Sequence, residues 1–245
     1  MFKNCLNLTS ITIPDGVTII QNYAFEICVE IDNIVIPDGV TFIGKYAFRH
    51  CIKLKNITIP NSVEHIESNV FMGSKCLDNI VIPNSVKYLG SYNFLACQNL
   101  KNITIPNTIT EIGDFMFSGC TSLENINIPN SITRIGSAAF RDCYALKNIE
   151  IPGSVKIIGT NAFINCLNLT TVVISEGTEY ISNLVFENCI YLTSITIPSS
   201  VISIGVRSFY QCNCNNLREI ITDKGNTEHL KKLLPEQLYK YIKEK

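Results

Sequence analysis

The sequence repeats itself every 23 residues, and this period constrains the fold more than any other feature. The lattice prolines are Pro14, Pro37, Pro60, Pro83, Pro106, Pro129, Pro152 and Pro198, with Ser175 in the one place where proline is missing. Phenylalanine keeps the same step at Phe2, Phe25, Phe48, Phe71, Phe94, Phe117, Phe140, Phe163, Phe186 and Phe209. Periods of about 20–50 residues are typical of solenoids and other repeat arrays. The chain is therefore predicted to be a stack of similar coils.

Each coil contains two short apolar segments and a turn. Leu123–Ile128 alternates apolar and polar residues up to the next proline, which predicts a short β-strand. Ile132–Ile135 predicts a second short extended piece, and the following Gly136 permits a turn that a Cβ would disfavour. Phe140 and Cys143 lie three residues apart, which favours one helical or 3₁₀ turn before the next strand.

A coil of this size cannot bury its apolar side chains alone, so it must pack them against the coils above and below. We expect a parallel main sheet and columns of like side chains, with Phe94 between Phe71 and Phe117. About nine such units occupy residues 1–221. The unit after Pro60 has Ser74 in place of the usual cysteine, which predicts a distorted turn there.

The two ends of the chain differ. Met1 and Phe2 stand where other units have Ala-Phe, so the first unit is truncated and its open core predicts self-association through this uncapped repeat. Residues 222–245 read as a helical cap, with one helix at Thr227–Leu234 and a second beginning at Pro235. The apolar residues expected to cover the last coil are Leu230, Leu233, Leu234, Leu238 and Ile242.

Composition excludes several classes of function. Hydrophobic residues make up 46% and charged residues 17%, and the formal net charge of -1 gives no positive excess for nucleic acid. No apolar run approaches the roughly 20 residues that cross a bilayer, so membrane insertion is not expected. The first residues also lack the apolar stretch of a secretory signal peptide.

Cysteine is abundant but follows the repeat. Nine of the 11 cysteines share one position: Cys5, Cys28, Cys51, Cys97, Cys120, Cys143, Cys166, Cys189 and Cys212. A buried free cysteine behaves as a small hydrophobe, and this spacing is unlike a zinc site, so neither a metal nor another cofactor is expected. Such an array fits a reducing setting better than an oxidising one. Cys76 and Cys214 lie off the lattice and are the two thiols expected to be accessible.

Catalytic patterns are missing from the sequence. The three histidines, His50, His65 and His229, fall in unrelated phases of the repeat, and the glycines occur singly. No Ser-His-Asp arrangement, Cys-His arrangement or phosphate-binding loop follows from them. We therefore expect no catalytic residues and no enzymatic activity.

The outward positions of the main sheet remain as candidate binding residues. One column contains six asparagines in successive coils, Asn33, Asn56, Asn79, Asn102, Asn125 and Asn148. The next outward column is mildly apolar but includes Asn127 and Glu150. Stacked amides either form a strip that binds a polypeptide or glycan, or bond to one another and stabilise the stack. The sequence leaves both roles open.

The repeated motif resembles one known family. Leu146-x-x-Ile149-x-Ile151-Pro152-x-Ser154-Val155-x-x-Ile158-Gly159-x-x-Ala162-Phe163-x-x-Cys166 closely resembles the BspA-type, or Treponema pallidum-type, leucine-rich repeat. The resemblance implies an arc with its parallel sheet on the concave side. It also implies a surface or secreted adhesin that binds a protein or glycan, host matrix proteins among them. The alternative is a structural spacer or self-association array without a ligand of its own.

Overall fold

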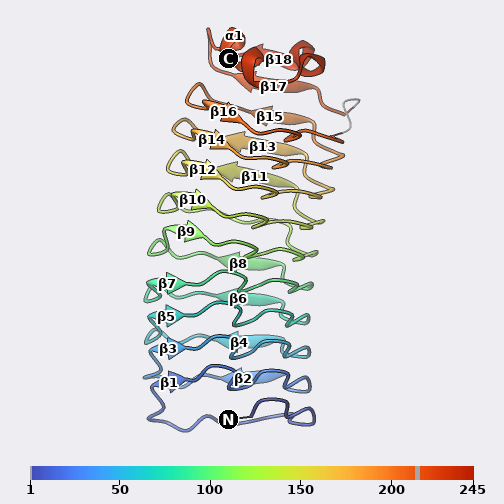
Figure 1. Ribbon diagram of the computed structural model, residues 1–245. Coiled ribbons are helices and arrows are strands. Elements are labelled where there is room, and N and C mark those ends of the chain that lie inside the picture. The colour runs from blue at the N-terminus through green and yellow to red at the C-terminus, as the bar shows by residue number, and fades with distance from the viewer. Residues whose placement is uncertain (1, 213–215) are drawn as a thin grey trace.

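The chain forms one elongated column of stacked coils. The computed structural model describes residues 2–212 and 216–245. Figure 1 shows the coils rising from the N-terminal end to the C-terminal end, where helix α1 (Thr227–Leu233) lies. Every strand pairing in the described residues is parallel. Where strands of two successive coils pair, the partners are equivalent residues of the repeat, such as Ile19 and Phe42. The predicted solenoid is confirmed.

The main sheet is built from the strand that precedes each lattice proline. Its strands are β2 (Asn33–Val35), β4 (Asn56–Thr58), β6 (Asn79–Val81), β8 (Asn102–Thr104), β11 (Asn148–Ile151), β13 (Thr171–Ile174), β15 (Ser194–Thr196) and β17 (Glu219–Thr222). They hydrogen-bond in three groups: β2 with β4, β6 with β8, and β11 through β17. The strand predicted at Leu123–Ile128 is wrong, because this segment pairs with neither β8 nor β11 and Ile126 is only partly buried.

The second sheet follows the proline in each coil. Its strands are β1 (Ile19–Ile20), β3 (Phe42–Ile43), β5 (His65–Ile66), β7 (Tyr88–Leu89), β9 (Glu111–Ile112), β10 (Arg134–Ile135), β12 (Ile157–Ile158), β14 (Tyr180–Ile181) and β16 (Ser203–Ile204). The extended piece predicted at Ile132–Ile135 is confirmed in β10. This sheet has two parts, β1 to β7 and β9 to β16, and it is interrupted between β7 and β9.

A third face, which we call the turn column, contains the Ala-Phe-x-x-Cys segments. The predicted helical or 3₁₀ turn is wrong in detail, because Ala138 and Asp142 have φ of 52° and 59° in the left-handed region. The segment is a run of hydrogen-bonded turns in which alternate N–H groups point along the stack. The N–H of Phe117 donates to the Ala139 carbonyl at 2.8 Å, and that of Phe140 to Ala162 at 2.8 Å.

The core is a column of stacked rings. Neighbouring column phenylalanines have ring centroids 5.0 to 5.8 Å apart. Phe94 lies 5.6 Å from both Phe71 and Phe117, which confirms the predicted order. Aliphatic side chains from both sheets, such as Ile149 and Ile158, are buried beside the rings. Burial is therefore shared between coils, as expected of a solenoid.

The repeated glycine is required for a reason other than the predicted turn conformation. The φ of Gly136 is outside the left-handed region, so no special turn conformation requires it. A Cβ there would lie 2.6 Å from the backbone nitrogen of Asp114 in the preceding coil. Glycine is needed because two coils approach closely at this corner.

The C-terminal end covers the last coil with mixed structure. After α1, residues Glu236–Tyr241 form a 3₁₀ helix, η1, and Ile242–Glu244 form strand β18. The predicted second helix is thus a 3₁₀ helix followed by a strand, because Ile242 pairs with Ile220 and extends the main sheet beyond β17. Leu230, Leu234 and Leu238 are buried, while Leu233 and Ile242 are partly buried against the core.

Candidate functional site

The main sheet presents the predicted asparagines to solvent. Asn33, Asn56, Asn79, Asn102, Asn125 and Asn148 are all exposed, as are Asn127 and Glu150. Their neighbours Ile34, Ile57 and Ile80 point into the core, because alternate residues of a strand face opposite sides. Sheet pairing places Asn33 beside Asn56 and Asn79 beside Asn102. The strip is divided where the strands separate.

Half of the six column amides have a side-chain hydrogen bond. The Asn102 amide donates to the Asn79 side-chain oxygen at 3.1 Å, and the Thr170 hydroxyl donates to Asn148 at 3.2 Å. Within the described ranges, the side chains of Asn33, Asn56 and Asn125 make no hydrogen bond. A continuous amide ladder is therefore not formed, and the free groups are available to water or a ligand.

Two grooves lie on this surface where main-sheet strands are unpaired. A groove of about 570 Å³ lies along β4 and β6, and its polar lining includes Asn56, Asn79 and Asn84. A second groove of about 320 Å³ contains Asn127 and Glu150 in its lining. Both volumes are within the about 300–1,000 Å³ typical of small-ligand clefts.

Charges beside the asparagine column are balanced between coils. Lys101 pairs with Asp78 at 3.4 Å, and Lys147 pairs with Glu124 at 2.8 Å. The hydrogen bond from Lys147 lowers the pKa of the Glu124 carboxyl. These exposed pairs contribute little to stability, but they leave the surface without a strong field of either sign.

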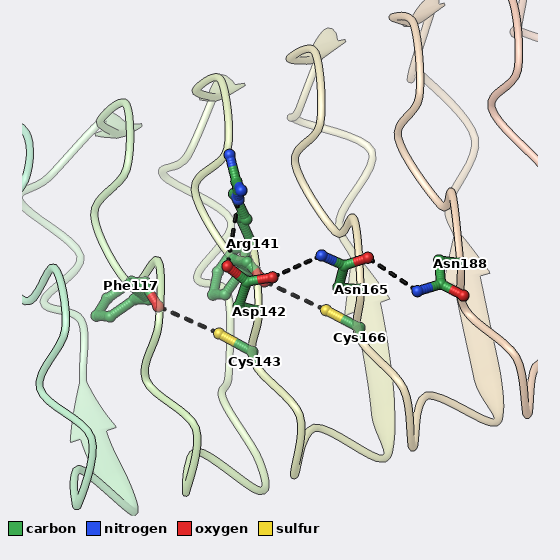
Figure 2. Close-up of polar contacts among 8 residues, drawn as sticks. Phe117, Arg141, Asp142, Cys143, Asn165, Cys166 and Asn188 are labelled. Carbon is green, nitrogen blue, oxygen red and sulfur yellow. Dashed lines mark hydrogen bonds and ion pairs between the residues drawn. The ribbon is translucent and has the colours of Figure 1, made fainter.

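The column cysteines act as buried donors in the turn column. Figure 2 shows the Cys143 thiol donating to the Phe117 carbonyl at 3.2 Å, and Cys166 does the same to Phe140 at 3.2 Å. Burial raises the pKa of Cys97 to about 12, so its thiol stays protonated at neutral pH. A protonated buried thiol is neither a nucleophile nor a metal ligand.

Ser74 replaces one of these cysteines and keeps its hydrogen bond to the preceding coil. Its hydroxyl donates to the Phe48 carbonyl at 2.9 Å, and its N–H donates to Phe71 at 3.1 Å. The buried hydroxyl thus makes the same bond as the thiol. The predicted distortion is confirmed earlier in the turn, where Val70 and Phe71 form bends and the Val70 N–H donates to the Asn93 side chain at 2.9 Å. Of the two off-lattice cysteines, Cys76 is partly buried, and Cys214 lies outside the described residues.

A polar chain on the turn column was not expected from the sequence. In Figure 2 the Asn165 amide donates to Asp142 at 2.7 Å and the Asn188 amide donates to Asn165 at 3.0 Å. Arg141 pairs with Asp142 at 3.2 Å. Asp142, Asn165 and Asn188 all have positive φ, a conformation that Asn and Asp tolerate well. These contacts connect neighbouring coils.

The second sheet carries apolar side chains on its outer surface. Rings stack from Phe42 to His65 at 5.0 Å and from His65 to Tyr88 at 4.4 Å. Tyr88 and Tyr180, which occupy the same column, are 46% and 42% exposed. This column was not predicted from the sequence, although the fifth residue after each lattice proline carries the signal.

Other kinds of site find no support in the described part of the chain. No group of three or more His, Cys, Asp or Glu side chains there could hold a metal ion. The His65 and Glu67 side chains lie 3.1 Å apart, and His229 contacts the Val201 carbonyl at 2.8 Å. No described helix has the length and apolar character to cross a membrane.

The first described coil has an apolar hollow on its outer side. Its volume is about 770 Å³, and its lining includes Phe2, Leu8, Ile11, Ile13 and Phe25. Phe2 is 41% exposed, whereas Phe25 stacks on both Phe2 and Phe48 and is buried. In each later coil this face is covered by the preceding coil, whereas in the first described coil it is exposed.

Parallel coils with a buried phenylalanine column and consensus aliphatic positions define a leucine-rich-repeat solenoid. The family model of the BspA type Leucine rich repeat region matches residues 1–124 and 88–218. The chain belongs to this BspA-type family. Proteins with this fold are generally binding or surface repeat modules rather than enzymes.

Several solved structures are similar to this chain, and the first of them supports the leucine-rich-repeat fold. A leucine-rich repeat protein from Bacteroides ovatus is 28% identical with a TM-score of 0.67, over 89% of this chain and 68% of that chain. A leucine rich cell surface protein from Faecalibacterium prausnitzii is 26% identical with a TM-score of 0.47, over 91% and 81%. The T. pallidum leucine-rich repeat protein is 26% identical with a TM-score of 0.45, over 57% and 77%. A search of curated proteins found no match.

Proposed function

We propose that this chain is a non-enzymatic binding module of a surface adhesin, and that its main sheet contacts a protein or glycan ligand. The observation that carries the proposal is the exposed asparagine column, in which three of the six side chains, those of Asn33, Asn56 and Asn125, make no hydrogen bond in the described structure. Each free amide offers donors and an acceptor to an incoming backbone or hydroxyl group. The surface location is part of the proposal, and the resemblance to a family with several members linked to adhesion supports it.

The surroundings of the column favour a macromolecular ligand over an anion. Val35 and Val81 are 63% and 66% exposed between the polar positions. Salt bridges between coils neutralise the neighbouring Lys101 and Glu124, so the surface is weakly polar. Surfaces with this mixture are typical of protein recognition. Matrix proteins of a host are therefore the first ligands to test.

The proposal predicts saturable binding to at least one member of a panel of purified matrix proteins and glycans. Replacing Asn102 or Asn125 with arginine, in two separate variants, should weaken that binding by about tenfold, because a long charged side chain blocks the strip. Biolayer interferometry with the immobilised panel measures both affinities.

The matched control is Gln98→Arg, which adds the same charge at an exposed turn position of the Asn102 coil. Its affinity should equal that of the unchanged protein. An affinity no higher than that of an unrelated repeat protein would contradict the proposal, as would equal losses in the control and the asparagine variants.

The apolar hollow of the first coil favours a second candidate function, a structural array that self-associates. Leu8 and Ile11 would pack against a further coil, as equivalent residues do within the stack. Multi-angle light scattering should then show dimers that an Ile11→Asp change converts to monomers. A monomer at every concentration would reject this function and leave the main-sheet proposal intact.

A further inference from the structure

The interruption of the second sheet leaves backbone groups unpaired. In neighbouring coils the Gly90 N–H donates to the Ile66 carbonyl at 2.9 Å and the Gly136 N–H to Ile112 at 2.8 Å. The equivalent bond from Gly113 to Leu89 is missing from the described contacts. So is the bond from Thr110 to Lys87, whose counterpart from Lys87 to Glu64 measures 2.8 Å. Two donors and two acceptors are thus left between β7 and β9.

These unpaired groups line a cleft of about 320 Å³. Its lining includes Lys87, Tyr88, Leu89, Thr110, Glu111 and Gly113. Leu89 is half-buried, whereas residues in its column on paired strands, such as Ile66 and Ile112, are buried. On the turn column the same two coils stay joined, with Phe94 donating to the Met116 carbonyl at 2.9 Å. The cleft therefore opens only on the sheet side.

One wall of the cleft is an aromatic ring. The Tyr88 ring stacks on His65 at 4.4 Å, so one of its faces is covered by the preceding coil. The opposite face turns toward the coil of Glu111. The Glu111 carboxylate pairs with Arg134, in the following coil, at 3.6 Å, and Tyr88 is 46% exposed. The second face of Tyr88 is left for a ligand.

We propose that this cleft binds a pyranose sugar of a glycan. The C–H groups of a pyranose pack on the electron-rich face of an aromatic ring, here the free face of Tyr88. Hydroxyl groups both donate and accept hydrogen bonds. They match the N–H groups of Thr110 and Gly113 and the carbonyls of Lys87 and Leu89. A buried apolar peptide side chain would leave these four groups unsatisfied.

This site is separate from the main-sheet surface. Tyr88 lies in the second sheet and the asparagine column lies in the main sheet. The two proposals can therefore fail independently. Loss of matrix binding in the asparagine variants does not test the Tyr88 cleft. Loss of glycoside binding in the Tyr88 variant likewise does not test the asparagine column.

The test is an NMR titration of the ¹⁵N-labelled protein with methyl glycosides of glucose, galactose, mannose and N-acetylglucosamine. At least one glycoside should shift the amide signals of Thr110 and Gly113 in a saturable way. Tyr88→Leu should weaken that binding by about tenfold, because leucine keeps the apolar bulk but loses the ring face.

Tyr180→Leu is the matched control, because Tyr180 occupies the same column on strand β14, which pairs on both sides with β12 and β16. This variant should bind the glycoside as the unchanged protein does. No shift at Thr110 and Gly113 with any of the four glycosides would overturn the proposal. Equal losses in both tyrosine variants, or saturable binding there of a proline-rich peptide alone, would also overturn it.

Discussion

The turn column and the two sheets hold the same coils together in different ways. Around the coil of residues 106–128, the turn column keeps its hydrogen bonds, such as the one from Phe94 to Met116 at 2.9 Å. The main sheet lacks strand pairing on both sides of Asn125–Asn127, and the second sheet is interrupted before β9. Hydrogen bonding between coils is therefore continuous along the turn column, and it is interrupted in both sheets.

The difference shows how stability and binding are divided in this solenoid. Column phenylalanines and thiols fill the space between coils and repeat in nearly every unit. Outward sheet residues contribute less to packing, so they are free to vary from asparagine to valine or tyrosine. Unpaired strand edges in the middle of the stack also supply backbone donors and acceptors for ligands.

The strongest test of the comparison removes a ring from the turn column. Phe117 is fully buried and lies 5.6 Å from Phe94 and 5.3 Å from Phe140. Phe117→Ala should lower the free energy of unfolding by about 3–5 kcal/mol, since it leaves a cavity between three coils. Urea denaturation followed by circular dichroism measures the change. Phe2→Ala, at a ring that is 41% exposed, should cost much less.

A pH titration sharpens the comparison for the buried thiols. Burial raises the pKa of Cys97 from 9.0 to about 12, so the folded state holds this proton more tightly than the unfolded state. The stabilisation is complete below pH 9 and is lost as pH rises toward 12.

Cys97→Ser should reduce this alkaline loss by about 1.4 kcal/mol per pH unit, because a serine hydroxyl does not titrate in that range. Ser74 shows that serine is accepted at the column position. Free energies of unfolding measured at intervals between pH 8 and 11 give the two slopes. Identical slopes for the variant and the unchanged protein would contradict the buried, protonated thiol.

The smallest expected effect is on the outward face of the main sheet. Asn102 is exposed and its side chain makes a single amide bond, to Asn79. Asn102→Ser should therefore change the free energy of unfolding by about 0.5 kcal/mol or less. Thermal and urea denaturation check it. A loss comparable to that of Phe117→Ala would show that the asparagines stabilise the stack.

The repeat period allowed the sequence to predict the coil, the phenylalanine column and the buried cysteines. Each of these depends on a residue type that packs against its own copy, as Phe94 does with Phe71 and Phe117. The asparagine column was also visible, because alternation along a strand places every second residue outside.

Features that depend on backbone conformation were not predictable in the same way. The positive φ of Ala138 has no residue signature, since alanine is unfavourable there, whereas Asp142 is a residue type that tolerates it. The hydrogen bond from Gly113 to Leu89 is missing from the described contacts, although both residues match the repeat almost as well as their neighbours do. The repeat pattern therefore could not predict its loss. The strand β18 was hidden within a segment of helical pattern, and its partner β17 decides its conformation.

Hydrogen exchange, resolved by residue with NMR, tests most directly the claim that one coil is firmly joined on the turn column and open on its sheets. The account predicts that the amides of Thr110, Gly113 and Glu124 exchange at least about tenfold faster than those of Thr133, Gly136 and Lys147, one coil further on. It also predicts that the Phe94 and Phe117 amides are equally protected. Uniform protection of all six sheet amides, or rapid exchange at Phe94, would contradict it.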